Sequence, residues 1–457
     1  MLIKNKRKIF RLSTLLFVVA LILFSCQKEI PEPEEKDPIA PIKSYIYAIM
    51  NDIYYWYRDI PRNIKPAPIK TVQEYYDTLI VPTDRWSWMM TGEEYISSET
   101  GVVETYGASL GQPIEYYQDY SIRVRYVHPE SPLYENGVRR GYQLTHLNGT
   151  PVMTLVGNGT FNSAYAGKTN EFTFVDYNNN SFTFTASARD VHTKSYLKRE
   201  IYTSKDYPGL PYNVGYFNYL SFKKTMLDDI KTSMVEFETA GIKELILDLR
   251  YNGGGDSEAT SLMANYLAPP SAHNKILARR EHNDKYSSWD SDILTQTIIQ
   301  NIGGSLRLNR LIILTSKASA SASEVLLNGL KPLMNVIQIG ATTYGKPNGM
   351  YVLAYPEGNY EKPQYVFLPI CFFSVNSEGK GHYVNGIEPD HYRADDLYHD
   401  FGLDDDLIKS SLYYIVNGSF PSLPPKPAAL QYPGQAARIK LPEERPDYGI
   451  YTSAKPH

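Results

Sequence analysis

The alternating serines of residues 319–324 (Ser-Ala-Ser-Ala-Ser-Glu) are the sharpest chemical feature of the sequence. They follow an apolar stretch, residues 311–315, that predicts a strand, and they open a stretch that predicts an amphipathic helix over 321–333. Ser321 and Glu324 fit a capping box, in which both side chains satisfy backbone N–H groups of the first turn. A serine hydroxyl at a helix start also lies in a positive field, which favours negative charge developing during nucleophilic attack. Both interpretations of Ser321, cap and nucleophile, remain open on this pattern.

A nucleophilic serine needs a base, and Lys346 follows Ser321 by 25 residues in the turn Thr343-Tyr-Gly-Lys. Lysine acts as a base only where burial or neighbouring charge lowers its pKa. A lysine in a glycine-flanked turn beside a strand end can be buried in that way, whereas the alternative is an exposed turn lysine. None of the nine histidines lies in a motif with Asp or Ser, so no Ser–His–Asp triad can be assembled locally.

Three consecutive glycines, residues 253–255, end the apolar stretch of residues 245–249. Glycine permits close approach and unusual φ values, so this turn can direct backbone N–H groups toward an oxyanion. A phosphate-binding loop is the competing interpretation. It is disfavoured because no Gly-Lys-Ser/Thr ending follows and the glycines lack the spacing of a dinucleotide motif.

The elements around these residues predict an α/β catalytic domain, a mixed sheet with flanking helices, over residues 191–418. Residues 42–100 show helical periodicity, with Ile46, Ile49 and Ile53 on one face, and predict an N-terminal helical region. Short β-type runs with turn signals predict a β-rich domain over 101–190. Strands of the catalytic domain are expected at 214–219, 244–249, 311–315, 336–340, 351–354 and 365–373, with a helix over 226–240.

The first 25 residues resemble an export signal. Basic residues precede an apolar segment, residues 12–24, that is too short to span a bilayer. Small and apolar residues directly before Cys26 resemble a lipobox, which implies a lipoprotein signal peptide over 1–25 and lipid attachment at Cys26. A plain secretory signal is the alternative. Residues 26–41, rich in Pro and Glu, predict a solvated tether, and the Pro-rich tail, residues 419–457, is expected to run over the surface or to be disordered.

Composition narrows the class of partner. A formal net charge of −4 argues against a nucleic-acid partner, because phosphate contacts need a basic face. The only cysteine besides Cys26 is Cys371, within an apolar run, and it is interpreted as a small buried hydrophobic residue. The 39 tyrosines are unusual and suit half-wet binding surfaces. No metal or organic cofactor is expected.

Taken together, the triglycine turn, the serine-rich helix start and the Tyr-Gly-Lys turn resemble, in order and spacing, the C-terminal processing (tail-specific) serine peptidases. The resemblance implies that Ser321 is the nucleophile and Lys346 the base. It implies oxyanion donors from the backbone of Ala322 and of Gly253 or Gly254.

Residues 127–149 also resemble the PDZ domain inserted in that family, so the domain over 101–190 is expected to be PDZ-like. Its peptide-carboxylate loop would be residues 106–111, which makes Ser109, Leu110 and Gly111 candidate peptide-binding residues. The implied activity is a serine endopeptidase that cleaves protein or peptide tails at the cell envelope, lipid-anchored to a membrane and facing the periplasm or the outside.

One departure concerns residue 350. Many family members carry a glutamine four residues after the base, where this chain has Met350, and a thioether cannot make the same hydrogen bonds. Met350 makes a catalytically impaired pseudopeptidase that binds peptides one alternative function, and a glycan-binding surface lipoprotein is another. The second is motivated by the tyrosines and gives no reason for the Ser, Lys and triglycine motifs to coexist.

Overall fold

The computed structural model describes residues 37–62, 71–291, 296–423 and 450–452. The chain divides into two units, Met1–Ile42 and Lys43–His457, and the description below concerns the second. Helix α2 (Ala40–Asp52) begins in the first unit. The predicted signal peptide and Cys26 lie outside the described residues. Within the described ranges no helix combines the length and the apolar character needed to cross a bilayer.

A six-stranded sheet forms the centre of the catalytic region, in the order β10-β11-β12-β16-β17-β22. Its first pair is antiparallel and the others are parallel, so the predicted mixed sheet is confirmed. Asp248 lies opposite Leu314, which brings the carboxyl ends of β12 and β16 together. The glycine turn and the serine turn therefore leave the sheet side by side. The strands are β10 (Tyr196–Tyr202), β11 (Val214–Tyr219), β12 (Glu244–Asp248), β16 (Arg310–Thr315), β17 (Val336–Gly340) and β22 (His391–Tyr392).

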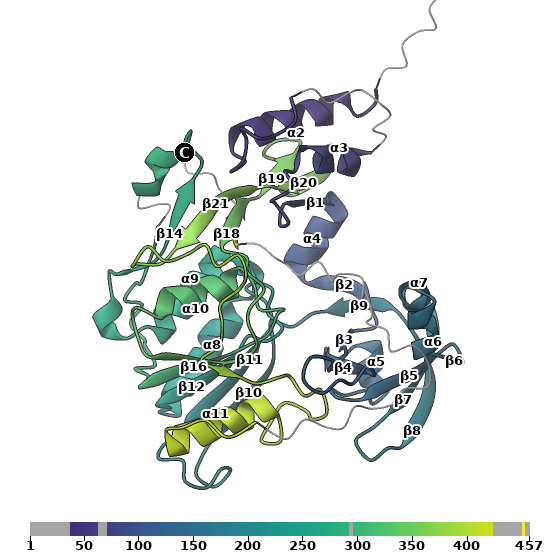
Figure 1. Cartoon of the computed structure of the whole chain (residues 1–457), viewed down its shortest axis with the longest axis vertical. Helices are drawn as coiled ribbons and strands as arrows, with labels where there is room; N and C mark the ends of the chain where they lie inside the picture. The colour runs from purple at the N-terminus through teal and green to yellow at the C-terminus, as the bar shows by residue number, and fades with distance from the viewer. Residues whose placement is uncertain (1–36, 63–70, 292–295, 424–449, 453–457) are drawn as a thin grey trace, which may run out of the picture. The chain divides into compact units, whose positions relative to one another are not determined.

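Helices cover both faces of this sheet (Figure 1). Helices α8 (Leu227–Thr239), α9 (Ser257–Leu267) and α10 (Ala322–Leu330) lie on one face, and α11 (Asp406–Asn417) lies on the other. Side chains of α11 pack against Ile246, Ile312 and Leu314 in one buried cluster. Since both faces are covered, the central strands read as continuous apolar runs rather than as alternating ones.

A second six-stranded sheet has the order β13-β23-β18-β21-β14-β15. Its strands are β13 (Gly255–Asp256), β23 (Ile450–Thr452), β18 (Asn348–Tyr351), β21 (Ile370–Val375), β14 (Ile276–His282) and β15 (Gln296–Ile298). Strand β23 corrects the expectation for residues 419–457, because these three tail residues pair with two strands of the core.

A three-stranded sheet, β1-β20-β19, lies beside the N-terminal helices α3 (Val72–Leu79) and α4 (Gly92–Thr100). Its strands are β1 (Trp88–Thr91), β20 (Tyr365–Leu368) and β19 (Leu353–Tyr355). The prediction of a purely helical region over 42–100 is therefore wrong at β1. The single strands predicted over 351–354 and 365–373 are each divided between two sheets. The second divides at Pro369, because proline has no N–H to donate to a ladder.

The β-rich region is an insert whose two ends meet. Strand β2 (Val102–Thr105) pairs with β9 (Arg189–His192) where the chain enters and leaves. Between them a sheet of order β3-β4-β5-β7-β8, with β6 beside β5, packs on the short helices α5, α6 and α7. The strands are β3 (Ala108–Gly111), β4 (Ile122–Val127), β5 (Gln143–Leu147), β6 (Thr150–Pro151), β7 (Thr169–Val175) and β8 (Ser181–Ser187); the helices are α5 (Pro132–Glu135), α6 (Val152–Gly157) and α7 (Phe161–Tyr165).

A buried ion network joins this insert to the central sheet. Arg140, from the insert, lies 2.6 Å from Asp395. Arg250, which follows β12, lies 2.8 Å from Asp248 and 2.8 Å from Asp405. Asp405 in turn caps α11 by accepting the backbone N–H of Leu407. The insert, the glycine-turn strand and α11 are therefore held by one set of paired charges with almost no solvent contact.

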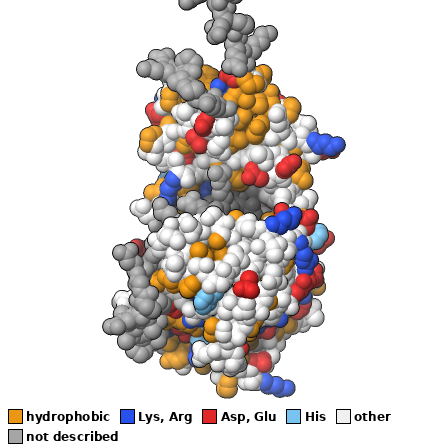
Figure 2. Space-filling view, turned by 90° about the vertical axis from the view of Figure 1, so that its right-hand side faces the viewer, with side chains coloured by type: hydrophobic (Ala, Val, Ile, Leu, Met, Phe, Trp, Pro, Cys, Tyr) orange, Lys and Arg blue, Asp and Glu red, His pale blue; other side chains and the backbone are white. Residues whose placement is uncertain are grey.

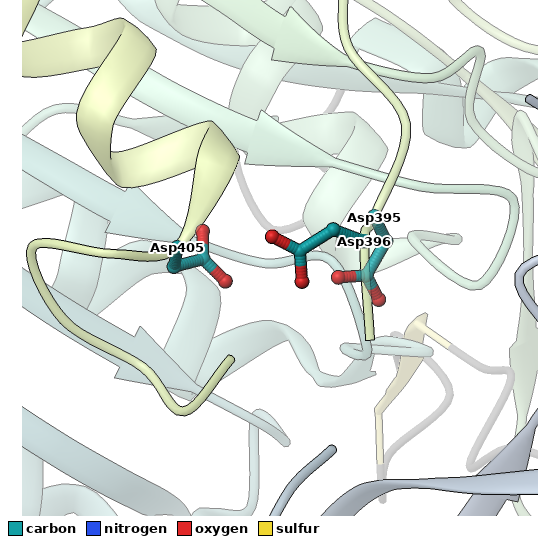
Figure 3. A group of neighbouring side chains, drawn as sticks. All are labelled: Asp395, Asp396 and Asp405. Carbon is teal, nitrogen blue, oxygen red and sulfur yellow. The ribbon is translucent and has the colours of Figure 1, made fainter. Parts of the chain in front are cut away.

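Figure 3 shows the carboxylates of Asp395, Asp396 and Asp405 grouped at the start of α11. One oxygen from each lies within 4.8 Å of the others, a spacing that a metal ion could use. Here Arg140 and Arg250 already supply positive charge to this group. Burial would raise the pKa of Asp395, but these two guanidinium groups bring it down to about 2. Asp395 therefore stays ionised as an ion-pair partner.

The tyrosines that suggested a binding surface contribute strongly to the core. Tyr54, Tyr76, Tyr216, Tyr219 and Tyr351 are among the largest fully buried side chains. On the face shown in Figure 2, Lys and Arg side chains lie beside Asp and Glu. That face therefore presents no extended field of one sign.

Removing a guanidinium group from the buried ion network should lower the free energy of unfolding. Arg250→Met leaves buried carboxylates unpaired, so we expect a loss of about 3–5 kcal/mol in unfolding free energy. Arg189→Met, which breaks an ion pair with both side chains about half exposed, is the matched control and should cost about 1 kcal/mol or less. Urea unfolding followed by circular dichroism measures both. Equal midpoints for the two variants would contradict the role given to Arg250.

Candidate active site

Ser321 lies at the sharp turn between β16 and α10. Its backbone conformation is one that residues other than glycine rarely adopt. Its φ is 54° and its ψ is −111°. Such backbone strain costs on the order of 1–3 kcal/mol and persists only where surrounding contacts enforce it. Its backbone N–H donates to Glu324 Oε2 at 2.8 Å, which is one half of the predicted capping box. Ser321 is also fully buried.

The glycine turn lies directly against the serine. A Cβ built on Gly254, whose φ is +118°, would lie 2.9 Å from Ser321 Cβ and 3.1 Å from the backbone N of Ala322. Only glycine therefore fits at this position. The N–H of Gly254 donates to Asn252 Oδ1 at 2.9 Å. That N–H is therefore engaged within the turn itself.

Asn252 fixes this turn onto the serine helix. Its carbonyl accepts the backbone N–H of Ala320 at 3.1 Å and the hydroxyl of Ser323 at 3.0 Å. Ser323 thereby has a structural hydrogen bond to the turn. These bonds hold the glycine turn against the start of α10, the two segments from which the sequence predicts the oxyanion donors.

The carboxylate of Glu324 connects the serine turn to the lysine turn. Its Oε2 accepts the backbone N–H of Ser321 and that of Lys346, each at 2.8 Å. Its Oε1 accepts the N–H of Gly345 at 2.7 Å and the hydroxyl of Thr343 at 2.5 Å. The backbone nitrogens of Ser321 and Lys346 are thus separated by no more than two hydrogen-bond lengths. Burial raises the pKa of Glu324, while these four bonds oppose the rise.

Lys346 has the environment that a lysine base needs. Its side chain has no exposed surface. Burial lowers its pKa to about 7, against the opposing attraction of the Asp84 and Glu324 carboxylates. A substantial fraction is therefore neutral near pH 7, in contrast to an ordinary surface lysine. The alternative of an exposed turn lysine is excluded.

Met350 lies beside the lysine, as its spacing suggested. Its Sδ is 3.7 Å from Lys346 Nζ, and its side chain is fully buried. A thioether is a weak acceptor, so this contact does little to stabilise a charged ammonium. The low pKa of Lys346 is consistent with such a weak partner.

The N-terminal region supplies two charged residues to the lysine turn. Asp84 is nearly buried, and its carboxylate accepts the hydroxyl of Tyr54 at 2.8 Å and the N–H of Trp86 at 2.8 Å. Arg85 donates to the carbonyls of Gly345 at 3.1 Å and Val384 at 2.7 Å. The turn that carries Lys346 is therefore held from the N-terminal side of the chain as well.

The structure brings Ser321, Lys346, Ala322 and the glycines of the turn into one buried site. The candidate peptide-binding residues Ser109, Leu110 and Gly111 lie elsewhere, on β3, which is at one edge of the insert's sheet in the described part of the chain. Cys371 is fully buried, as predicted. Sequence reasoning assigned Glu324 only a capping role, and it missed Asp84, for which no local signal exists.

Comparison with known proteins agrees with this geometry. The family model described as Peptidase family S41 matches residues 213–392, and the model of the Peptidase S41 N-terminal domain matches residues 41–88. A probable CtpA-like serine protease of Staphylococcus epidermidis is 24% identical over 393 residues, which are 84% of this chain and 71% of that protein. A similar protein of Staphylococcus aureus is 23% identical over 350 residues, 76% of this chain and 63% of that protein.

A solved structure of similar fold is that of a putative S41 protease from Bacteroides fragilis. Its TM-score is 0.64 at 23% identity, and the match covers 82% of this chain and 97% of the other. Fold, buried serine and family matches together define a serine-type peptidase. The chain belongs to peptidase family S41.

Burial of Lys346 should destabilise the protein in a pH-dependent way. Between pH 7 and 10.5 the unfolded lysine holds a proton that the folded one has lost, so wild-type stability should rise with pH across this range. Lys346→Met removes the penalty and should stabilise the protein by up to about 5 kcal/mol at pH 6, with a gain of only about 2 kcal/mol at pH 9. Denaturant unfolding at both pH values measures this.

The exposed lysine Lys380, whose side chain is 74% exposed, provides the control. Lys380→Met should leave the midpoint unchanged at both pH values. A gain for Lys346→Met that is equal at pH 6 and pH 9 would contradict a lowered lysine pKa.

Proposed function

We propose that this protein is a serine endopeptidase that cleaves the tails of proteins or peptides through a Ser321–Lys346 dyad. The observation that carries the proposal is the Glu324 carboxylate, which binds the backbone of both residues with a single oxygen. A lysine with a pKa of about 7 supports the assignment, because a general base works best when its pKa lies near the working pH.

In the proposed mechanism, neutral Lys346 takes the proton of the Ser321 hydroxyl as the oxygen attacks the scissile carbonyl. The backbone N–H groups of Ala322 and Gly253 stabilise the resulting oxyanion. The protonated lysine then gives its proton to the leaving amine, which leaves an acyl-enzyme. Water activated by neutral Lys346 hydrolyses this ester and restores the dyad. No step requires a metal or an organic cofactor.

The insert is proposed to be a PDZ-like domain that captures the substrate tail. Strand β3 lies at a sheet edge and pairs on its other side with β4, so an extended tail can add to it by main-chain hydrogen bonds. Ser109, Leu110 and Gly111 would then contribute their backbone N–H and C=O groups. A lipid anchor at Cys26 is proposed to hold the enzyme at the cell envelope, on the periplasmic or outer side.

Ser321→Ala should abolish cleavage while the fold is retained. Loss of the nucleophile is expected to lower kcat by at least about a thousandfold. Ser323→Ala, two residues away, removes a hydroxyl that only bonds the Asn252 carbonyl and should reduce stability while cleavage stays measurable. Peptide cleavage followed by mass spectrometry, with circular dichroism as a folding check, tests both. Undiminished cleavage by folded Ser321→Ala would rule out the dyad.

Met350→Gln should move the pH dependence of cleavage. The wild-type rate is expected to rise through about pH 7 as Lys346 loses its proton. A glutamine carbonyl accepts a stronger hydrogen bond from the ammonium than a thioether does, so it should raise the pKa of Lys346. The midpoint of the rise in rate should therefore move to a pH that is higher by roughly half a unit to one unit. Met350→Leu, which offers no acceptor, is the control and should not move the midpoint upward.

This variant also tests the second candidate, a pseudopeptidase that binds peptides without turnover, which is favoured by Met350 beside Lys346. That candidate predicts no cleavage by the wild type and no labelling of Ser321 by a serine-reactive probe. Cleavage gained only in Met350→Gln would support it. A midpoint at the same pH in Met350→Gln and wild type would contradict the role given to residue 350.

A further inference from the structure

The strand of the C-terminal tail, β23, lies between two strands that each lead from the active site. Its Ile450 is opposite Gly255 of β13, and its Tyr451 is opposite both Asp256 of β13 and Met350 of β18. Both pairings are parallel. A three-residue segment thus runs in the same direction as its two neighbours and completes the sheet between them.

Both neighbouring strands begin next to the catalytic residues. Gly255 directly follows Gly254, whose backbone lies against Ser321. Strand β18 begins at Asn348, two residues after Lys346. The space between β13 and β18, here called the tail slot, therefore opens at its upstream end onto the proposed dyad.

The tail slot is built to pair with a backbone. The other edge of β13 is already used, because Phe222 accepts the N–H of Asp256 at 2.6 Å and donates to Gly254 at 2.9 Å. The other edge of β18 pairs with β21. The backbone N–H and C=O groups on the edges of β13 and β18 that face the slot can therefore pair with a further strand. Strand edges of this kind bind extended segments readily.

We propose that the tail slot is a binding site for the main chain of one extended peptide, and that residues 450–452 of the chain itself occupy it in competition with substrate. This inference rests on the proposed peptidase function for its consequence, although the pairing itself does not. Recognition through the backbone tolerates many side chains, as cleavage of diverse tails requires.

The direction of the strand determines which part of a substrate would take the slot. In a parallel arrangement, the amino-terminal end of the bound segment lies nearest Gly254 and Ser321. A substrate in the slot would therefore place residues that follow the scissile bond between β13 and β18. The slot holds the portion that is to be removed.

Binding of residues 450–452 in the tail slot should be weak and reversible. Three residues make only a few backbone hydrogen bonds, and each of them contributes little net free energy in water. A tethered segment nevertheless experiences an effective concentration of about the millimolar range, which keeps such a site largely filled. Displacement of the tail frees the facing edges of β13 and β18 for the main chain of a substrate.

The test compares the full chain, a chain that ends at Tyr448, and Tyr451→Pro. Proline at residue 451 cannot donate to a ladder and should disfavour a strand with two neighbours. Ala454→Pro, beyond β23, is the matched control. We expect deletion and Tyr451→Pro to raise kcat/KM for a peptide substrate several-fold, mainly through KM, and Ala454→Pro to leave it unchanged.

A second readout does not depend on catalysis. In a Ser321→Ala background, amide hydrogen exchange at residues 255–256 and 348–351 should accelerate after deletion of the tail. A synthetic peptide of residues 445–457, added at about 1 mM, should restore protection.

The outcomes separate the two proposals. If no protein cleaves peptide but exchange changes as expected, the peptidase function fails and the tail slot stands. If cleavage is robust yet neither kcat/KM nor exchange responds to the deletion, the tail slot is overturned and the peptidase stands. Faster exchange that the added peptide does not reverse would also overturn it.

Discussion

The carboxylate of Glu324 is the interaction on which the site depends. It accepts four hydrogen bonds from two turns that lie more than twenty residues apart in the chain, and it is fully buried. A buried carboxylate with fewer partners would be expensive to keep ionised, so each donor is needed for the others to be tolerated. The strained backbone of Ser321 and the placement of Lys346 both follow from this requirement.

Buried charged groups elsewhere in the structure also depend on how well their partners replace lost hydration. Lys346 is about half neutral at pH 7 because burial removes hydration that the Asp84 and Glu324 carboxylates only partly replace, whereas Arg140 and Arg250 keep their charge because carboxylates surround them. The difference lies in the partners and not in the depth, since Lys346, Arg250 and nearly all of Arg140 are buried.

Local pattern in the sequence was sufficient for four of the six strands of the central sheet, β11, β12, β16 and β17, whereas β10 and β22 were not predicted. The strands predicted at 214–219 and 336–340 match β11 and β17 to the residue, since a strand covered on both faces is a continuous apolar run. The helix start at Ser321 and the glycine turn were likewise visible as capping and turn chemistry. Asp84 and β23 were not visible, because the role of each is defined by partners far away in the sequence. Pro369 was visible, but its effect of dividing one apolar run between two sheets was underestimated.

The arginine that the insert contributes has an evolutionary consequence. The ends of the insert meet in the β2–β9 ribbon, so by connectivity alone it could be exchanged for another domain. Arg140, however, neutralises carboxylates that belong to the catalytic core. A lineage that replaced this insert would lose one of the two guanidinium groups that pair with Asp395 and would keep only that of Arg250, unless the new domain supplied an equivalent cation. Insert and core are therefore expected to be inherited as one unit, and chimeras between distant relatives should be viable only when this charge pair is matched.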